Sequence, residues 1–224
     1  MQRLKTILFN RGVPATESFA IEDVSEAAAA ALLAHGPTLL QYGPSLGFAP
    51  LREWLAAAHG VPVEQVIVGN GSLQLLEFLC LSQVRAGDVV LTESPTYDRT
   101  LTLLRRHGAR PVGVPLGEDG PDLARLEALL AAERPRFVYL IPDFQNPSGA
   151  TCSGEKRRRI AALAERHDLL LVEDAPYRSL RYRGAEEPSL LSLAPGRTIH
   201  MSSFSKLVGP GPRVGYMVGP AKLV

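Results

Sequence analysis

The residues around Lys206 are the strongest candidates for covalent chemistry in this chain. Ser203 and Ser205 precede the lysine, and Arg213 follows it by seven residues. A lysine amine can form a Schiff base with a carbonyl compound, and two hydroxyls and an arginine are donors suited to a dianionic phosphate. Ser203 and Lys206 also satisfy the Ser-x-x-Lys pattern of serine acyl-transfer enzymes. The Ser-Asp-Asn and Lys-Thr-Gly companions of that class are absent from the sequence, so the segment favours Schiff-base chemistry beside a phosphate.

A second candidate for anion binding is the turn 69–72, Gly-Asn-Gly-Ser, between a short β-branched run and an apolar helical pattern. Backbone N–H groups at the start of a helix attract anions, and glycine lets a phosphate approach closely. Leu75 and Leu76 follow where a third glycine would fall, so this is not a dinucleotide-binding fingerprint. Alone, such a turn is typical of ordinary capping chemistry, and it needs partners elsewhere in the chain.

Two further polar segments each follow a predicted strand. Asn146, in the segment 143–149, can both donate and accept hydrogen bonds, although an Asn-Pro pair is also typical of a plain turn. Asp174 comes at the end of the apolar run 169–172, where a carboxylate is costly unless it is paired. It is therefore either a helix cap or the partner of a buried cation. Polar groups at the carboxyl ends of parallel strands lie where open α/β sheets bind ligands.

The elements that position these residues alternate between short β-branched runs and longer helical patterns from about residue 66 onward. This alternation predicts an α/β fold with three layers, α/β/α, around a mostly parallel seven-stranded sheet. The predicted strands are 66–68, 89–91, 112–114, 137–141, 169–172, 198–201 and 214–218. The predicted helices between them are 72–84, 97–107, 121–133 and 155–167, with Gly87 and Gly108 where a left-handed stop is needed. The last two strands are too close for a helical crossover, so the seventh is expected to run antiparallel.

Composition excludes several classes of protein. The 224 residues are 46% hydrophobic, which is enough for a sizeable core and excludes a disordered chain. The 24 Lys and Arg nearly balance the 23 Asp and Glu, so no overall field attracts the chain to nucleic acid or to an anionic membrane. Cys80 and Cys152 have no zinc or redox spacing and are expected to be buried and reduced. With no signal peptide or membrane-spanning run, the sequence predicts a cytoplasmic protein without a metal.

Residues 1–48 differ from the rest. They contain an irregular start with Gly12 and Pro14, then an alanine-rich helix over 23–34. We predict that residues 1–48 form an N-terminal arm and helix, and that residues 49–224 form the large ligand-binding domain.

Seven segments, taken together and in order, resemble the fold-type I aminotransferases that use pyridoxal 5′-phosphate. The resemblance points to the branch that contains 2-aminoadipate and kynurenine aminotransferases and the effector domains of MocR-type regulators. The matching segments are 12–14, 41–44 with 47–52, 70–74, 93–97, 142–149, 173–177, and 203–206 with 210–215. Each motif alone is weak, but together they cover essentially the whole chain.

The resemblance implies catalytic roles for Lys206, Asp174 and Tyr177. Lys206 would hold the cofactor as an internal aldimine and then move a proton between the substrate Cα and C4′ of the cofactor. Asp174 would pair with the pyridine nitrogen, while Asn146 and Tyr177 would hydrogen-bond the 3′ oxygen and Tyr97 would stack on the ring. The implied phosphate contacts are Ser72, the backbone of Leu73, Ser203, Ser205, Arg213 and, from a neighbouring subunit, Tyr42. That last role requires a homodimer with shared sites.

Some positions depart from the family pattern. Leu73 stands where many relatives have glutamine, and Pro212 stands where leucine is usual. Arg11 lies where relatives often carry glycine beside the substrate, so Gly12, Asn146 and Arg11 are the candidate substrate contacts, although Arg11 could equally point to solvent.

The implied reaction is transfer of an amino group between an α-amino acid and a 2-oxo acid such as 2-oxoglutarate. Two alternatives use the same residues: a ligand-sensing effector domain without turnover, and a β-lyase or decarboxylase. Family members are longer, and their C-terminal small domain carries an arginine that binds the substrate carboxylate. No arginine of this chain matches it. We therefore expect a C-terminally truncated aminotransferase that turns over far more slowly than a full-length relative.

Overall fold

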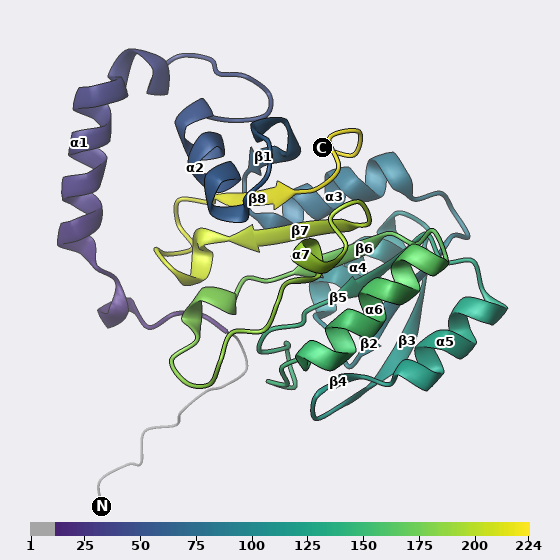
Figure 1. Ribbon diagram of the computed structural model, residues 1–224. Coiled ribbons are helices and arrows are strands. Elements are labelled where there is room, and N and C mark those ends of the chain that lie inside the picture. The colour runs from purple at the N-terminus through teal and green to yellow at the C-terminus, as the bar shows by residue number, and fades with distance from the viewer. Residues whose placement is uncertain (1–11) are drawn as a thin grey trace, which may run out of the picture.

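A computed structural model describes residues 12–224, and an eight-stranded sheet forms its centre (Figure 1). The strand order is β1-β8-β7-β6-β5-β2-β3-β4. The five central strands β7, β6, β5, β2 and β3 pair in parallel, and β8 runs antiparallel to both of its neighbours. The strands are β1 Val66–Gly69, β2 Val89–Ser94, β3 Arg110–Gly117, β4 Gly120–Pro121, β5 Phe137–Leu140, β6 Leu171–Asp174, β7 Thr198–Ser203 and β8 Gly215–Val218. The predicted mostly parallel α/β fold and the antiparallel seventh strand are confirmed.

The prediction of seven strands was wrong by one. β4 has only two residues and forms a hairpin with β3, in which Leu116 pairs with Pro121 and Gly117 with Gly120. A two-residue strand carries no period-two pattern, so periodicity could not reveal it. The strand predicted over 169–172 in fact covers Leu171–Asp174, which places both Glu173 and Asp174 within β6 rather than beyond it.

Helices cover both faces of the sheet (Figure 1). Side chains of α5, α6 and α7 pack on one face, and those of α3 and α4 pack on the other. The helices are α1 Ile21–Leu39, α2 Ala49–His59, α3 Ser72–Gln83, α4 Asp98–Arg106, α5 Leu123–Ala132, α6 Gly154–Arg166 and α7 Leu190–Leu193. Cys80 and Cys152 are both free and buried in these layers, as predicted.

Capping residues explain where two crossover helices begin. Asp122 accepts the N–H of Arg125 at 3.0 Å and starts α5, so this helix begins after Pro121, which belongs to β4. Ser153 accepts the N–H of Lys156 and starts α6. Side-chain oxygens at these positions satisfy N–H groups that have no partner inside the helix.

The N-terminal segment stands apart from the sheet (Figure 1). Helix α1 extends beyond the predicted 23–34 at both ends, and none of its residues is buried. Helix α2, which was not predicted, packs against β1 through Leu55 and Ala56. The division into an arm of residues 1–48 and a domain of residues 49–224 stays a prediction. Between residues 12 and 224, no helix combines the length and the apolar character needed to cross a membrane.

The strand order creates a switch point between β2 and β5. From β2 the chain adds β3 on one side, whereas β5, β6 and β7 follow one another on the other side. Crevices at the carboxyl ends of strands beside such a point are the usual ligand sites of open α/β sheets. The segments that follow β2 and β5 contain Tyr97 and Asn146, two of the predicted site residues.

Candidate functional site at the carboxyl ends of the strands

Asn146 and Tyr177, predicted to share one ligand atom, lie next to each other. The Asn146 side-chain amide donates to the Tyr177 hydroxyl at 3.4 Å, joining the turn after β5 to the turn after β6. Burial raises the pKa of Tyr177, and the nearby Asp174 carboxylate and Tyr97 hydroxyl raise it further. Tyr97 and Tyr177 both pack against the apolar cluster under α3 and α4. The four predicted residues Asn146, Tyr177, Asp174 and Tyr97 therefore lie near one another.

Asp174 is a buried carboxylate with only one of its two oxygens satisfied. Its Oδ2 accepts a hydrogen bond from the Tyr139 hydroxyl at 2.5 Å. Its Oδ1 is buried and has no hydrogen-bond partner among residues 12–224. Burial raises the pKa of Asp174 to about 6, although the Tyr139 hydrogen bond and the charge of His200 act in the opposite direction. A buried acceptor without a partner is costly, which marks Oδ1 as a site for a donor supplied by a ligand.

The start of α3 forms a cradle with Arg213. The Arg213 guanidinium donates to the Asn70 carbonyl at 3.3 Å, directly beside the turn that opens the helix. Gly71 has φ +94°, and a Cβ there would lie 2.6 Å from the Arg213 Nη2 atom. β8 also approaches the start of α3 closely, because a Cβ on Gly215 would lie 2.4 Å from the backbone nitrogen of Ser72. Glycine therefore brings a helix N-terminus and a guanidinium together, an arrangement suited to an anion.

Lys206 lies in a serine-rich turn at the end of β7. The Ser203 hydroxyl accepts the N–H of Ser205 at 3.1 Å and contacts its hydroxyl at 2.8 Å, which holds the short 3-10 turn Phe204–Lys206. The Lys206 amine donates to the Gly12 carbonyl at 2.5 Å, and partial burial lowers the pKa of this amine. A lowered pKa increases the fraction of neutral, nucleophilic amine.

Of three further predicted residues, only Leu73 lies at the cradle in the described part of the chain. Tyr42 is fully exposed, at 100% of its accessible area, on the loop between α1 and α2. Leu73 lies in the first turn of α3, where only its backbone could serve an anion. Arg11 lies outside the described residues, so its predicted substrate contact is not placed.

Sequence reasoning missed the residues that support this site from behind. Gln145 donates to Glu93 at 3.1 Å and to the Pro95 carbonyl at 2.8 Å, which ties the turn after β5 to the end of β2. Burial raises the pKa of Glu93 to about 8, against the hydrogen bonds from Ile141 and Gln145. Tyr139, which donates to Asp174, was also missed. The signal that could have found it was the alternation of side chains along β5 and β6, which places Tyr139, Val172 and Asp174 on one face of the sheet.

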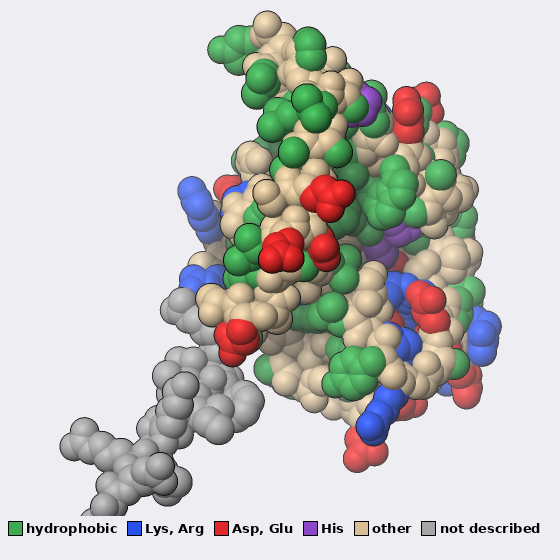
Figure 2. All heavy atoms as spheres, turned by 90° about the vertical axis from the view of Figure 1, so that its left-hand side faces the viewer, with side chains coloured by type: hydrophobic (Ala, Val, Ile, Leu, Met, Phe, Trp, Pro, Cys, Tyr) green, Lys and Arg blue, Asp and Glu red, His purple; other side chains and the backbone are tan. Residues whose placement is uncertain are grey.

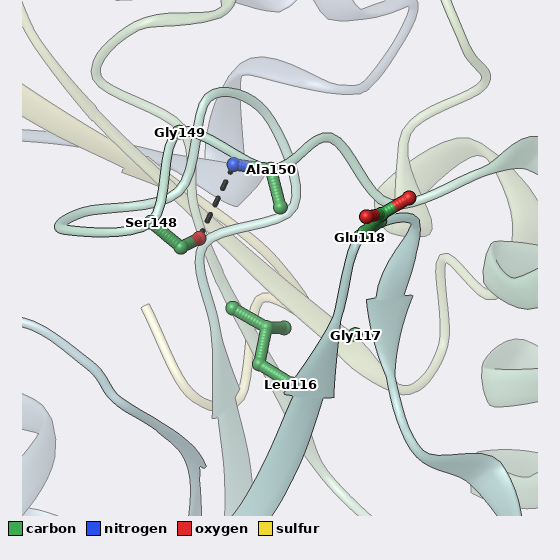
Figure 3. Close-up of a pocket in the computed structure, with 6 residues that line it drawn as sticks. All are labelled: Leu116, Gly117, Glu118, Ser148, Gly149 and Ala150. Carbon is green, nitrogen blue, oxygen red and sulfur yellow. Dashed lines mark hydrogen bonds between the residues drawn. The ribbon is translucent and has the colours of Figure 1, made fainter.

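A hollow beside the same turn is lined by none of the predicted residues. It is formed by Leu116, Gly117 and Glu118 of the β3 end and by Ser148, Gly149 and Ala150 (Figure 3). The Ser148 hydroxyl accepts the Ala150 N–H at 3.2 Å and so closes the turn on itself (Figure 3). Glu118 is the one charged residue among those that line this hollow.

An anion cradle, a half-satisfied carboxylate and a lysine at one edge of a parallel sheet are features of the α/β proteins that bind a phosphorylated cofactor at the strand ends. Within that class the chain has a definite place. Residues 5–224 match the family model "Aminotransferase class I and II", and the chain belongs to this family. Pyridoxal phosphate is the cofactor of these aminotransferases.

Curated relatives carry several substrate names. The chain is 42% identical to a 2-aminoadipate transaminase of Thermus thermophilus, a match that covers 97% of this chain and 56% of the relative. It is 34% identical to aromatic-amino-acid aminotransferase 1 of Thermococcus litoralis, over 92% of this chain and 52% of that protein. The chain thus spans about half the length of these relatives.

Solved structures agree with this placement. The α-aminoadipate aminotransferase of Thermus thermophilus, in complex with N-(5′-phosphopyridoxyl)-L-leucine, has a TM-score of 0.90 and 41% identity, covering 95% of this chain and 56% of that one. The kynurenine aminotransferase of Pyrococcus horikoshii has a TM-score of 0.88 and 32% identity, with the same coverage of 95% and 56%.

Proposed function

We propose that this protein transfers an amino group between an α-amino acid and a 2-oxo acid such as 2-oxoglutarate, with pyridoxal 5′-phosphate as cofactor. The observation that carries the proposal is the unpartnered Oδ1 of Asp174. A protonated ring nitrogen is the donor that this buried acceptor lacks. The names of the relatives favour 2-aminoadipate, kynurenine or aromatic amino acids as donors.

When bound, the cofactor supplies an aldehyde that reacts with amines and a ring that withdraws electrons from the substrate Cα. In the proposed site Asp174 keeps a proton at the ring nitrogen, because a carboxylate in contact favours the charged form of a base. Asn146 and Tyr177 hydrogen-bond the ring oxygen as a pair, and Tyr97 covers the ring.

The phosphate is assigned to the cradle. Arg213 and the Ser72 hydroxyl, with the first N–H groups of α3 at Ser72 and Leu73, bind one side of it. Ser203 and Ser205 bind the other side. Charge-assisted hydrogen bonds of this kind are about twice as strong as neutral ones, so they account for most of the expected cofactor affinity.

Lys206 is assigned two tasks. Its amine would attach the cofactor through the cofactor's aldehyde, and as a free amine it would move a proton at the substrate Cα. The low pKa that burial gives Lys206 suits both tasks, because each requires the neutral amine. The amine donates to the Gly12 carbonyl, which supports Gly12 as a proposed substrate contact beside Lys206. Gly12, Asn146 and Arg11 remain the proposed substrate contacts.

A homodimer completes the proposal. Helix α1 has no buried residue, and apolar side chains line the face that it presents (Figure 2). Leu33 of α1 is 89% exposed, and Ile21 of the same helix is 71% exposed. An apolar surface of this kind on a free helix is suited to a second copy of the chain, which would also bring its Tyr42 to the phosphate. The cytoplasmic location stays a prediction.

The decisive experiment locates the covalent attachment. The purified 224-residue chain is mixed with the cofactor, reduced with borohydride, digested and mapped by mass spectrometry. We expect the label on Lys206, and a label on another lysine would overturn the assignment. Lys156 serves as the internal control, because it binds Asp119 and the Gly120 carbonyl far from the cradle.

A turnover assay then separates an enzyme from a sensor. The chain is incubated with the cofactor, 2-oxoglutarate and a panel of amino acids, and glutamate is measured. We expect slow glutamate formation that Lys206→Ala abolishes. Covalent attachment without any glutamate would support the sensor alternative, whereas consumption of the amino acid with release of carbon dioxide or of its β-substituent would support a decarboxylase or a lyase.

A further inference from the structure

The sheet register brings Tyr139 and Asp174 together. Tyr139 on β5 pairs with Val172 on β6, and Asp174 is two residues further along the same strand. Side chains two apart point to the same face of a sheet, so Tyr139 and Asp174 share the face that α3 and α4 cover. Glu173, which lies between Val172 and Asp174 on β6, points to the opposite face and contacts His200.

The hydrogen bond between the two side chains has a fixed direction. Burial, followed by the charge of the adjacent Asp174, raises the pKa of Tyr139 well above its ordinary value. The hydroxyl therefore keeps its proton and donates it to Oδ2. With Oδ2 engaged by Tyr139, Oδ1 is the carboxylate oxygen that has no partner in the described chain.

A donor on one oxygen also weakens the affinity of the carboxylate for a proton. A hydrogen bond to the charged form of an acid favours that form. In a contact between a carboxylate and a ring nitrogen, one proton lies between the two, and it stays on the nitrogen only while the carboxylate is the weaker base. Tyr139 acts on this balance although it does not reach the ring itself.

From this geometry we propose that Tyr139 is a positioning residue: it turns Oδ1 of Asp174 toward the cofactor and keeps their shared proton on the ring nitrogen. The proposal rests on the proposed function, because it requires the ring nitrogen to meet Asp174. Without the Tyr139 hydroxyl, the proton would pass to Asp174, leaving a neutral ring and a neutral acid. The proton is only relocated in this step, so charge is conserved.

The test measures the nitrogen directly. The chain is loaded with cofactor labelled with ¹⁵N in the ring, and the ¹⁵N chemical shift is recorded between pH 6 and pH 9. We expect the protonated position for the unaltered chain and the unprotonated position for Asp174→Asn, which together define the scale. Tyr139→Phe should move the signal toward the unprotonated position and weaken cofactor binding on the order of tenfold.

Two further variants of this chain complete the experiment. Tyr216→Phe removes another partly buried tyrosine hydroxyl, 3.2 Å from the His59 Nε2 atom on the opposite face, and should leave the signal unchanged. If Tyr139→Phe folds poorly, as judged by its melting temperature, 3-fluorotyrosine at position 139 keeps the side-chain shape and donates more strongly. It should move the signal toward the protonated position.

The outcomes separate the two proposals. An unaltered chain that fails to bind the cofactor, or binds it with an unprotonated nitrogen, overturns the proposed function. A protonated nitrogen that neither Tyr139→Phe nor the fluorinated variant moves overturns the role of Tyr139 and leaves the proposed function standing.

Discussion

Glu173 and Asp174 are neighbours on β6, both acidic and both buried, yet their surroundings differ. Glu173 is 0% exposed and Asp174 is 7% exposed. Glu173 accepts hydrogen bonds from the Leu190 and Leu191 N–H groups and contacts His200 Nδ1 at 2.9 Å. Although burial raises the pKa of Glu173, these partners lower it below its ordinary value. Within residues 12–224 the Asp174 carboxylate has a single hydrogen-bond partner, so burial prevails and raises its pKa.

The face that holds Glu173 carries further buried charge pairs. Arg157 is entirely buried and forms two salt bridges. Its guanidinium lies 2.9 Å from the Asp143 carboxylate and 4.0 Å from the Glu173 carboxylate. Asp143 also contacts Arg178 and Arg181. Buried charges with all their partners hold a fold in register, whereas a buried charge that lacks one is ready for a ligand. Two adjacent carboxylates thus differ in their partners because alternate residues of a strand face different layers.

Asp174→Asn should give the largest effect and the sharpest contrast. An amide cannot keep the ring nitrogen protonated, so we expect amino-group transfer to fall by roughly 10³-fold, within the range of lost acid-base assistance. Single-turnover kinetics of the amino acid half-reaction measure this loss. A near-normal rate would show that Asp174 is as structural as Glu173.

Glu173→Ala should chiefly affect stability. It leaves His200 and two N–H groups without their acceptor, and breaking such a buried set costs about 3–5 kcal/mol of unfolding free energy. Urea denaturation followed by circular dichroism measures the change, with Glu173→Gln as the control that retains one acceptor oxygen and should lose less than half as much. Unchanged stability in Glu173→Ala would break the comparison.

The pH dependence of stability should separate the two acids. The folded-state pKa of Asp174, about 6, lies above its ordinary 3.8, so the charged carboxylate costs about 3 kcal/mol in the cofactor-free protein at neutral pH. This cost grows as pH rises from about 4 to 6 and is constant above that. Asp174→Asn should therefore be the more stable protein at pH 7.5, with an advantage that vanishes near pH 4. The Glu173 contribution has the opposite sign, because its pKa is lowered: it is present above about pH 4.5 and disappears at lower pH.

Arg213→Ala should weaken cofactor binding without changing the fold. The variant loses a charge-assisted hydrogen bond of about 2 kcal/mol, which corresponds to a roughly 30-fold higher dissociation constant. Fluorescence titration with the cofactor measures the affinity. Arg159→Ala is the matched control, because that arginine lies on α6, over the other face of the sheet, and pairs with Glu127 at the surface. A loss of rate at saturating cofactor with unchanged affinity would contradict this role.

Tyr42→Phe should have the smallest effect. If Tyr42 reaches the phosphate of a second copy, its hydroxyl contributes about 1.5 kcal/mol and its loss raises the dissociation constant roughly tenfold. Sedimentation velocity with and without cofactor gives the assembly state, and Tyr182→Phe, another exposed tyrosine, serves as the control. A monomer that binds cofactor at full strength would disprove a shared site.

Local pattern was enough to predict the layered fold and to single out the polar segments at strand ends, whereas Tyr97 and Tyr177 were named only through the resemblance to a family. The strands were recognisable as β-branched runs, and the candidate residues followed them because polar groups at strand ends stand out against apolar sequence. Boundaries failed where local signals conflict. Pro121 was predicted in a helix because apolar residues follow it at helical spacing, but its pairing with Leu116 belongs to a hairpin that only the folded chain forms.

The sequence by itself determined which side chains of this protein carry charge, donors and a nucleophile, and that they fall at strand ends. Only the tertiary structure decided which of them are satisfied. The meeting of Tyr139 and Asp174 joins positions 35 residues apart through strand register, and that of Arg213 and Asn70 joins positions 143 apart. Burial and pairing depend on these long-range contacts, and they give two adjacent acids opposite pKa shifts that no local pattern encodes.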